Sequence, residues 1–284
     1  MIADEHNISS AAYSLANCYG LIGQSDREYE YLLKAAGSDG SGMYEVGMRY
    51  EEKRDMGKAI KYYLIAVSKN EECAIVKLGN CYKHEKKYDE MKKYYLMAIE
   101  KDCAEAMCNF GQYYCHIEKK EEEAIRYYLM AIDKGYSEAM CQLADYYSLK
   151  NNYDEMKKYY LMAIENGNIN AMLSFGNYYE RIDNNTNHAI EYYLMAIQRN
   201  NKDAMDMMAS LYYNINDYFN SLKYYQMCVD NSSDECNCRH LCDCLVFLPF
   251  IKVRIKEIKP LALQQISTDP SNIERKIANG PNEC

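Results

Sequence analysis

Apolar positions recur along the chain with the spacing of amphipathic helices. In the stretch Ala106 to Tyr114, small or apolar residues occupy positions i, i+4, i+5 and i+8, which lie on one face of a helix. The stretch Glu121 to Ile132 has such residues at i, i+4, i+7 and i+8, counted from Ala124. Short polar turns separate these stretches, and no alternation typical of strands occurs before residue 245. The pattern predicts an all-α chain built from pairs of helices.

This pair of stretches repeats at a nearly fixed period. The second aromatic residue of the motif Tyr-Tyr-Leu-Met-Ala-Ile, or of a variant of it, recurs in steps of 32 or 33 residues. A period in this range is typical of a solenoid, in which each unit packs on its neighbours. The sequence therefore predicts a right-handed α-solenoid of about seven antiparallel helix pairs over residues 9–229, with a C-terminal cap and a non-repeat tail. The motif or its variants begin at Glu30, Tyr62, Tyr94, Tyr127, Tyr159, Tyr192 and Tyr224.

A small residue recurs inside the first helix of every predicted pair. Gly within a helix costs up to about 1 kcal/mol relative to Ala, so its repeated presence requires a reason. Close approach of the second helix supplies one, with the second tyrosine of the motif filling the space between the two helices. The small residues are Ala16, Gly47, Gly79, Gly111, Ala144, Gly176 and Ala209.

The N-terminal end of the array is short. The first helix is predicted to begin near residue 9, which leaves about eight residues before it. Asn7 and the pair Ser9–Ser10 are the candidate caps, because their side chains can accept hydrogen bonds from the first turn.

The C-terminal end departs from the repeat. Residues 230–250 are predicted to form a degenerate capping helix, since a terminal repeat needs a polar outer face. Residues 251–284 are predicted to be a C-terminal tail that is partly disordered. Within it, Ile251 to Ile258 alternate between apolar and charged residues, which indicates either a half-buried strand or a docking segment.

The composition is that of a folded soluble protein with an acidic balance. The chain has 284 residues, of which 49% are hydrophobic and 26% charged, and its net charge is −9. No stripe of basic residues is visible over the repeats, so nucleic acid is not an expected partner. No apolar run approaches the roughly 20 residues that span a bilayer, and the N-terminus lacks the features of a secretory signal. The chain is therefore expected to be cytoplasmic, with its cysteines reduced.

The repeat resembles a known family. The first helices follow the pattern small-x-x-x-Leu/Phe-Gly/Ala-x-x-Tyr, and in one pair Leu143, Met156, Tyr160 and Ala163 are separated by 13, four and three residues. This spacing resembles the tetratricopeptide repeat. The junction Ala163 to Tyr179 lacks the usual proline turn and resembles the Sel-one-like repeat, although the longer loop of that family is missing. The resemblance implies a non-enzymatic scaffold or adaptor whose first helices line a concave groove for a peptide or partner helix.

The resemblance also implies which residues face that groove. Carboxylate-clamp members of the family use Asn with Lys and Arg to hold the terminal carboxylate of a peptide. The corresponding residues here are not all in adjacent repeats, which argues against one such clamp. A regulatory array for a separate enzyme is an alternative, and the sequence leaves the oligomeric state open. The groove-facing candidates are Tyr13, Asn17, Tyr44, Asn80, Lys83, Gln112, His116, Asp145, Asn177 and Arg181.

A metal site is a further alternative, in the segment after the repeats. Thiolate and imidazole side chains suit zinc or copper(I). On a helix the five side chains would fall on two faces, and the Cys-x-x-Cys spacing is missing, so cysteines that replace Ala or Met in a helix fit the pattern as well. The potential ligands are Cys236, Cys238, His240, Cys242 and Cys244.

Signals of catalysis are weak. His84 and His116 fall at equivalent places at the ends of successive first helices, without a Ser or Cys nucleophile motif. No Gly-rich phosphate loop occurs. The tyrosine pairs fit core packing better than stacking platforms for nucleic acids or sugars, with the first tyrosine of each pair half exposed. The sequence predicts no catalytic residue and no cofactor.

Overall fold

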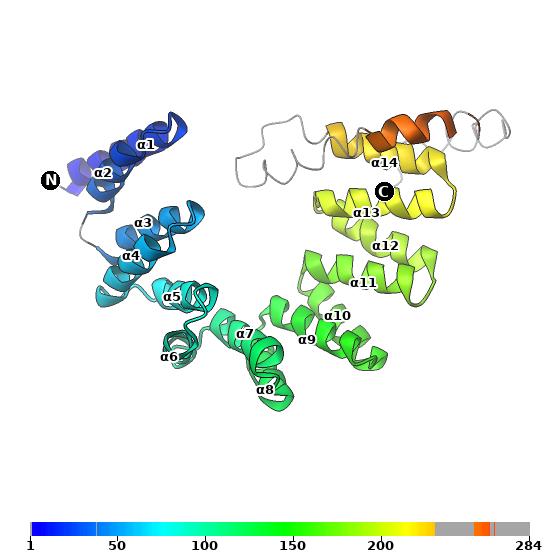
Figure 1. Cartoon of the computed structure of the whole chain (residues 1–284), viewed down its shortest axis with the longest axis horizontal. Coiled ribbons are helices and arrows are strands. Elements are labelled where there is room, and N and C mark those ends of the chain that lie inside the picture. The colour runs from blue at the N-terminus through cyan, green and yellow to red at the C-terminus, as the bar shows by residue number, and fades with distance from the viewer. Residues whose placement is uncertain (1, 38, 231–252, 262–263, 265–284) are drawn as a thin grey trace. The chain divides into compact units, whose positions relative to one another are not determined.

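The computed structural model describes residues 2–37, 39–230, 253–261 and 264. The regular elements of these ranges are helices in sequential antiparallel pairs, which confirms the predicted all-α solenoid (Figure 1). The first helices are α1 (Ile2–Leu21), α3 (Gly40–Glu52), α5 (Cys73–His84), α7 (Ala104–Tyr113), α9 (Ser137–Leu149), α11 (Ile169–Arg181) and α13 (Lys202–Asn214). The second helices are α2 (Ser25–Ala36), α4 (Met56–Ser68), α6 (Tyr88–Ile99), α8 (Glu121–Asp133), α10 (Tyr153–Glu165), α12 (Thr186–Ile197) and α14 (Tyr218–Asp230). A π-helix, η1 (Tyr114–Glu118), continues α7, and residues 253–261 form one further helix.

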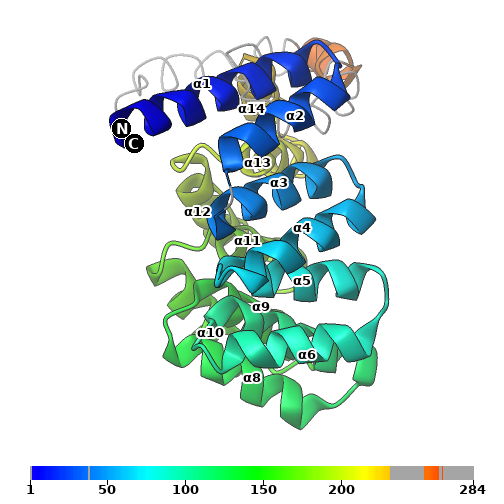
Figure 2. The same cartoon turned by 90° about the vertical axis from the view of Figure 1, so that its left-hand side faces the viewer.

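The chain divides into two compact units, Met1–Gln142 and Leu143–Cys284, called unit 1 and unit 2 below. In unit 1 each helix packs on its pair partner and on the next helix along the chain (Figure 2). In unit 2 the helices from α10 to α14 pack in the same order. Nearest-neighbour packing of this kind is what defines a solenoid.

Asx side chains begin many of the helices. Their carboxylate or amide oxygens accept hydrogen bonds from backbone N–H groups of the first turn, which otherwise lack partners. Single residues with left-handed φ, such as Lys86 (φ 59°) and Asn151 (φ 56°), then turn the chain between the two helices of a pair. The capping residues are Asp39, Asp55, Asn152, Asn168, Asn185 and Asn201.

The recurring small residue lies where the two helices of a pair come closest. A Cβ atom added at Gly79 would lie 2.4 Å from ring carbons of Tyr95, whose side chain is fully buried. Ring carbons of the equivalent tyrosines crowd Gly47, Gly111 and Gly176 in the same way. The predicted close approach, with the second tyrosine of the motif filling the space, is confirmed.

Two pairs carry one extra residue between the small residue and the buried tyrosine. Gly79 and Tyr95 are 16 residues apart, whereas Gly111 and Tyr128 are 17 apart. The fourth pair absorbs the extra residue in the π-helix η1, whose i→i+5 hydrogen bonds span one more residue than those of an α-helix. The sixth pair, with the same count, absorbs it in the turn that follows α11.

The predicted N-terminal boundary is wrong. Helix α1 begins at Ile2, so Asn7, Ser9 and Ser10 lie inside the helix and not before its first turn. The residues before Asn7 include no Gly or Pro that would stop a helix, and the acidic pair Asp4–Glu5 suits a first turn, where the helix dipole favours negative charge.

The strand interpretation of the C-terminal segment is also wrong. Residues 253–261 are helical, because Ile255 and Ile258 are three residues apart and satisfy helical as well as strand spacing. Ile258 is fully buried against Ala209 and Tyr225 of the last pair, as expected of a docking segment. The predicted capping helix at 230–250 lies, beyond its first residue, outside the described residues.

Candidate partner-binding face

The hydroxyl of the buried tyrosine in a second helix reaches the first helix of its own pair. Tyr95 Oη donates a hydrogen bond to Asn80 Oδ1 over 2.7 Å, and Asn80 directly follows the small residue Gly79. We call the residue after the small residue the tyrosine-facing position. Tyr63 instead reaches Glu51, one turn further along, at 2.5 Å. In other pairs the contacts at this position are Tyr160 with Asp145 at 2.5 Å, Tyr193 with Asn177 at 2.9 Å, and Tyr225 with Ser210 at 3.2 Å.

Several predicted groove residues therefore also hold the core together. Asn80 Oδ1 accepts a second hydrogen bond, from Asn109 Nδ2 at 3.0 Å. Its own Nδ2 group has no hydrogen-bond partner among the described residues, and the side chain is half-buried. The core tyrosine thus fixes the orientation of Asn80 and leaves its amide donor available.

Lys83 lies one turn beyond Asn80 on α5. Its Nζ donates to Gln112 Oε1 of the next first helix at 3.2 Å, and burial lowers the pKa of its ammonium group. Among the described residues, no carboxylate forms an ion pair with this half-buried cation. We call Asn80, Lys83, Asn109 and Gln112 the amide–lysine cluster. It joins three predicted residues with Asn109, which the sequence did not single out.

Aromatic and acidic side chains lie towards the other end of the first helices in unit 1. Tyr44 and Tyr136 are both half-buried, and Glu105 is a neighbour of each. Burial and the nearby Glu105 carboxylate raise the pKa of Tyr136 to about 12. The helix dipole favours negative charge at the N-terminus of a helix and positive charge at its C-terminus. Glu105 in the first turn of α7 and Lys83 in the last turn of α5 fit this rule, so the face has an acidic edge and a basic edge.

Unit 2 has a small cavity on the equivalent surface. Its volume is about 240 Å³, and it brings together the predicted residues Asn177 and Arg181. Ser148 and Ser174 were not among the predicted residues. Alignment of the repeats on the small residue would have found them, because they occupy the positions of Lys83 and Asn109 in their own pairs. The lining residues are Ser148, Tyr160, Ser174, Asn177, Tyr178, Arg181 and Ile182.

In the described part of the chain, the side chains of the predicted groove residues Asn17 and His116 make no hydrogen bond with the amide–lysine cluster, with the residues around Glu105 or with the lining of the cavity of unit 2. Asn17 accepts a hydrogen bond from Arg49 Nη2 at 2.5 Å, within unit 1. His116 is exposed on η1. The side chain of Tyr13 lies outside the described part.

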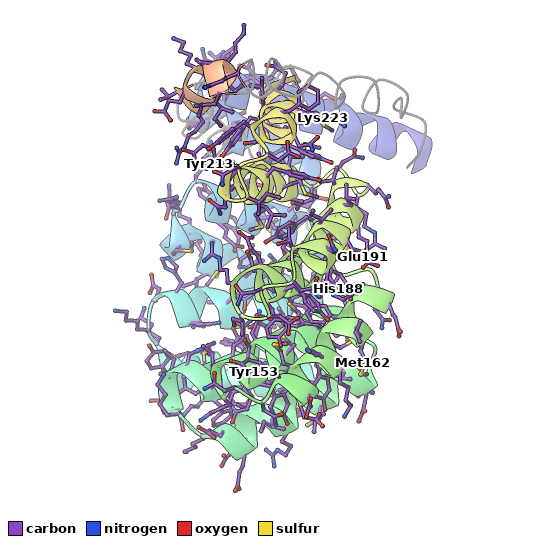
Figure 3. The ribbon with its side chains drawn as sticks, turned by 90° about the vertical axis from the view of Figure 1, so that its right-hand side faces the viewer. Tyr153, Met162, His188, Glu191, Tyr213 and Lys223 are labelled. Atoms are coloured by element: carbon purple, nitrogen blue, oxygen red, sulfur yellow. The ribbon has the colours of Figure 1, made fainter. Side chains whose placement is uncertain are left out.

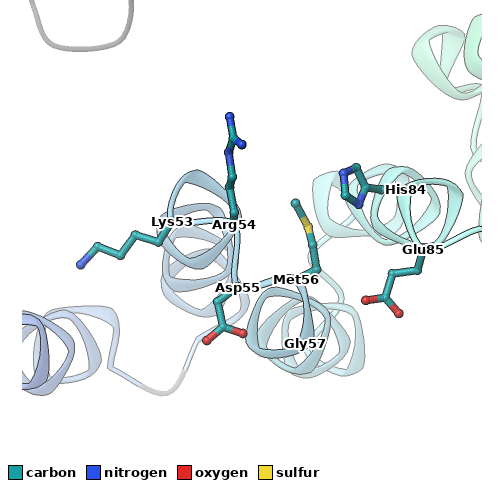
Figure 4. A pocket seen from close by; sticks show the side chains of 7 residues that line it. All are labelled: Lys53, Arg54, Asp55, Met56, Gly57, His84 and Glu85. Carbon is teal, nitrogen blue, oxygen red and sulfur yellow. The ribbon is translucent and has the colours of Figure 1, made fainter. Parts of the chain in front are cut away.

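One depression among the described residues of unit 1 offers little chemistry. Lys53 to Gly57, His84 and Glu85 line it. Figure 4 shows Arg54 and His84 on its walls and Lys53 turned away, where Lys53 pairs with Glu28. Cations and carboxylates are mixed there, and no nucleophile stands beside the imidazole.

The tyrosine pairs are packing elements. Rings at the seam of each pair stack nearly parallel, as in Tyr82 on Tyr94 with centroids 5.5 Å apart. Tyr94 is half-buried as predicted, but its equivalents Tyr127 and Tyr159 are only 8% exposed.

Three cysteines of the first helices behave as small apolar residues. Cys81, Cys108 and Cys141 are buried and form no disulfide. Burial raises the pKa of the Cys81 and Cys108 thiols to about 12, so neither is a thiolate at neutral pH.

Neither a metal site nor a membrane span is found in the described ranges. Those residues contain no group of three or more metal-ligating side chains. The predicted cluster Cys236–Cys244 lies outside them and stays a prediction, which elemental analysis of the reduced protein would test. Within the same ranges, no helix has the length and apolar character needed to cross a bilayer.

The chain is similar to known repeat proteins. Residues 74–100 and 137–166 match the family model described as Tetratricopeptide repeat. A Sel1 repeat protein from Oxalobacter formigenes is 23% identical, with a TM-score of 0.55 over 76% of this chain and 98% of that one. Yeast Tom70 is 15% identical, with a TM-score of 0.67 over 97% of this chain and 58% of its own. No curated protein sequence matches significantly.

Fold and register together define an α-solenoid repeat protein. The matches above make the chain similar to repeat proteins of the tetratricopeptide and Sel1-like type. Repeats of this type typically mediate protein–protein interactions and are generally non-catalytic scaffolds.

Proposed function

We propose that the chain is a non-enzymatic scaffold or adaptor that binds an extended peptide or a partner helix on the first-helix faces of its pairs. The observation that carries this proposal is Lys83, a half-buried cation whose hydrogen bond goes to the neutral amide of Gln112. Burying a charge without a counter-charge costs stability. A carboxylate of a partner would compensate it through a charge-assisted hydrogen bond.

The donors around Lys83 support an acidic or carboxylate-bearing contact. The Nδ2 group of Asn80 and the ammonium group of Lys83 come from the same face of α5, one turn apart. In unit 2, the cavity at Asn177 and Arg181 offers an amide and a guanidinium four residues apart on α11. The proposal therefore has one contact region in each unit.

Sequence differences among the pairs favour the first helices, and not the second helices, as the partner-binding surface. The second helices carry nearly the same motif in every pair. The leucine of this motif is on the surface in several of them, with Leu64, Leu96 and Leu161 being 39%, 44% and 43% exposed. A surface that is the same in every pair cannot distinguish one part of a partner from another. The tyrosine-facing position, in contrast, is Asn, Met, Gln, Asp or Ser in different pairs.

The same proposal places the protein in the cytoplasm, where buried thiols such as Cys81 and Cys108 stay reduced. A separate enzyme is one kind of partner that the scaffold would serve.

The double variant Asn80→Ala/Lys83→Ala tests the proposal. Tagged wild type and variant are used to capture partners from the native cell, and the captured proteins are quantified by mass spectrometry. Proteins held through this face should fall at least tenfold in the variant. Its circular dichroism should stay that of a folded helical protein, and its melting temperature, lowered by loss of the Tyr95–Asn80 hydrogen bond, should stay well above the capture temperature. Lys93→Ala is the matched control, because Lys93 is exposed on the second helix α6. Unchanged capture by a folded double variant would refute binding at this segment.

A further inference from the structure

The chain places one of its own helices on the first-helix face of the last pair. The Arg254 guanidinium lies over the ring of Tyr213, 5.2 Å from its centroid. Tyr213 is labelled in Figure 3. Four residues later, Ile258 is fully buried against Ala209 and Tyr225. Helix 253–261 thus contacts α13 and α14 through the cation of Arg254 and the aliphatic side chains of Ile255 and Ile258.

The contacted positions match the candidate partner-binding face by register. Tyr213 lies four residues after the small residue Ala209, which is the position of Lys83 relative to Gly79. Ser210, whose hydroxyl is 3.2 Å from the Tyr225 hydroxyl, holds the tyrosine-facing position. Helix 253–261 therefore contacts the last pair at positions equivalent to those of the candidate partner-binding face.

The contact is small for a permanent cap. Of the nine residues in helix 253–261, only Ile258 is buried, and Arg254 and Ile255 are half-buried. The other six are exposed, including Val253 at 52% and Leu261 at 37%. Elements with few buried contacts open more readily than core helices.

The internal helix also leaves a charge on α13 without a direct counter-charge. Asp206 is half-buried and has no hydrogen bond or ion pair among the described residues, and Arg254 instead pairs with Glu257 of its own helix at 3.4 Å. Burial raises the pKa of the Asp206 carboxyl, and Arg254 offsets this only in part. A helix that carried a cation directly to Asp206 would bind this face more tightly than helix 253–261 does.

We propose that the first-helix face of α13, completed by Tyr225, is a helix-binding site that helix 253–261 occupies as a displaceable internal ligand. The partner that fits it is a short amphipathic helix with an arginine followed four residues later by an aliphatic residue. This inference rests on the proposed function, since it takes the first-helix faces to be the binding surface.

Fluorescence anisotropy with a labelled peptide of residues 253–264 tests the inference on the full chain. Ile258→Asp in the chain should release its own helix, so this variant should bind the peptide at least tenfold more tightly than wild type, whose site is filled. A peptide with Arg254→Ala should lose most of that binding. A peptide with Lys256→Ala is its control, because Lys256 is exposed. If Ile258→Asp melts the last pair, Ile258→Ala replaces it.

Equal peptide binding by wild type and a folded Ile258 variant, or no binding by either, would overturn the inference. The proposed function is tested separately, because Asn80 and Lys83 lie in unit 1 and this site lies in unit 2. If the peptide fails while Asn80→Ala/Lys83→Ala still loses its cellular partners, only the inference about helix 253–261 falls.

Discussion

Tyr95 Oη donates a hydrogen bond to Asn80 Oδ1 over 2.7 Å, so a core side chain orients a residue of the candidate partner-binding face. The same relationship joins Tyr193 to Asn177 at 2.9 Å in unit 2. The repeated tyrosine is therefore more than filler between helices, because it couples the packing of each pair to the polar groups that the pair presents.

Tyr95→Phe tests this coupling. Loss of the hydroxyl should lower the free energy of unfolding by about 1 kcal/mol and weaken partner capture several-fold, since Asn80 would lose its fixed orientation. Thermal denaturation and quantitative capture measure the two effects. Tyr94→Phe is the matched control, because Tyr94 stacks on Tyr82 and its hydroxyl has no hydrogen bond in the described part. Equal behaviour of the two variants would contradict the coupling.

Gly79→Ala tests the close approach of α5 and α6. The new Cβ would lie 2.4 Å from the buried ring of Tyr95, so either the ring or the helix must shift. Overpacking of this kind costs about 1–3 kcal/mol, which exceeds the gain of up to about 1 kcal/mol in helix propensity. The melting temperature should therefore fall.

Gly57→Ala is the control for this substitution, since the nearest atom to its added Cβ is Asp55 Oδ1 at 3.8 Å. It should leave the melting temperature unchanged or raise it. A Gly79→Ala protein as stable as wild type would show that the ring of Tyr95 moves aside at little cost.

The fold could be predicted from the sequence because three sequence features have one physical cause. The period, the small residue and the buried tyrosine all follow from the close packing of the two helices of each pair. Gly79 and Tyr95 must keep their spacing if the helices are to touch, and the equivalent spacing is 16 or 17 residues in the other five pairs with a buried tyrosine. The π-helix η1 was not readable, because the extra residue after Gly111 could equally have entered a turn, as it does after α11. Apolar spacing likewise could not separate helix from strand over 253–258.

The candidate site was readable only in part. Register along one helix placed Asn80 and Lys83 on one face. The contacts of Lys83 with Gln112, and of Asn80 with Asn109, cross from one first helix to the next and depend on how the pairs stack. The sequence repeat predicts which pairs are neighbours. It does not predict the distances between side chains of neighbouring first helices, on which these hydrogen bonds depend.

Lys83→Met should have opposite effects on stability and binding. Burial lowers the pKa of Lys83 from its ordinary 10.5, so the folded state pays for the charge at neutral pH. Met keeps the apolar length of the side chain and removes the charge, so the melting temperature should stay the same or rise while partner capture falls. A variant with lower stability and unchanged capture would make Lys83 a structural residue.

The pH dependence of the same variant follows from linkage. Because the folded pKa of Lys83 is depressed, the unfolded state binds more protons as pH approaches 10.5 from below, and wild type gains stability as pH rises through that window. The advantage of Lys83→Met should therefore be largest at neutral pH and disappear near pH 10.5. Denaturation of both proteins across this range measures it, and a pH-independent difference would rule out the buried charge as its cause.

Glu118 should make the fourth pair sensitive to acid. Its carboxylate accepts hydrogen bonds from Lys92 at 2.5 Å and Tyr113 at 2.8 Å and pairs with Lys120 at 2.6 Å. Led by Lys120, these partners lower its pKa from 4.5 to about 2. A depressed carboxyl pKa stabilises the folded state above pH 4.5, and this stabilisation is lost as pH falls towards about 2. Glu118→Gln should cost about 1 kcal/mol at pH 7.

The difference between Glu118→Gln and wild type should shrink below pH 4.5, where wild type also loses the charge. Thermal melts at several pH values measure it, and amide hydrogen exchange of residues 114–120 locates it. Glu165→Gln is the control, because Glu165 is exposed on α10 and has no hydrogen bond or ion pair in the described part of the chain. A constant difference between pH 7 and pH 3 would mean that the shape of the side chain stabilises η1. In that case the charge of Glu118 would contribute nothing to holding the π-helix.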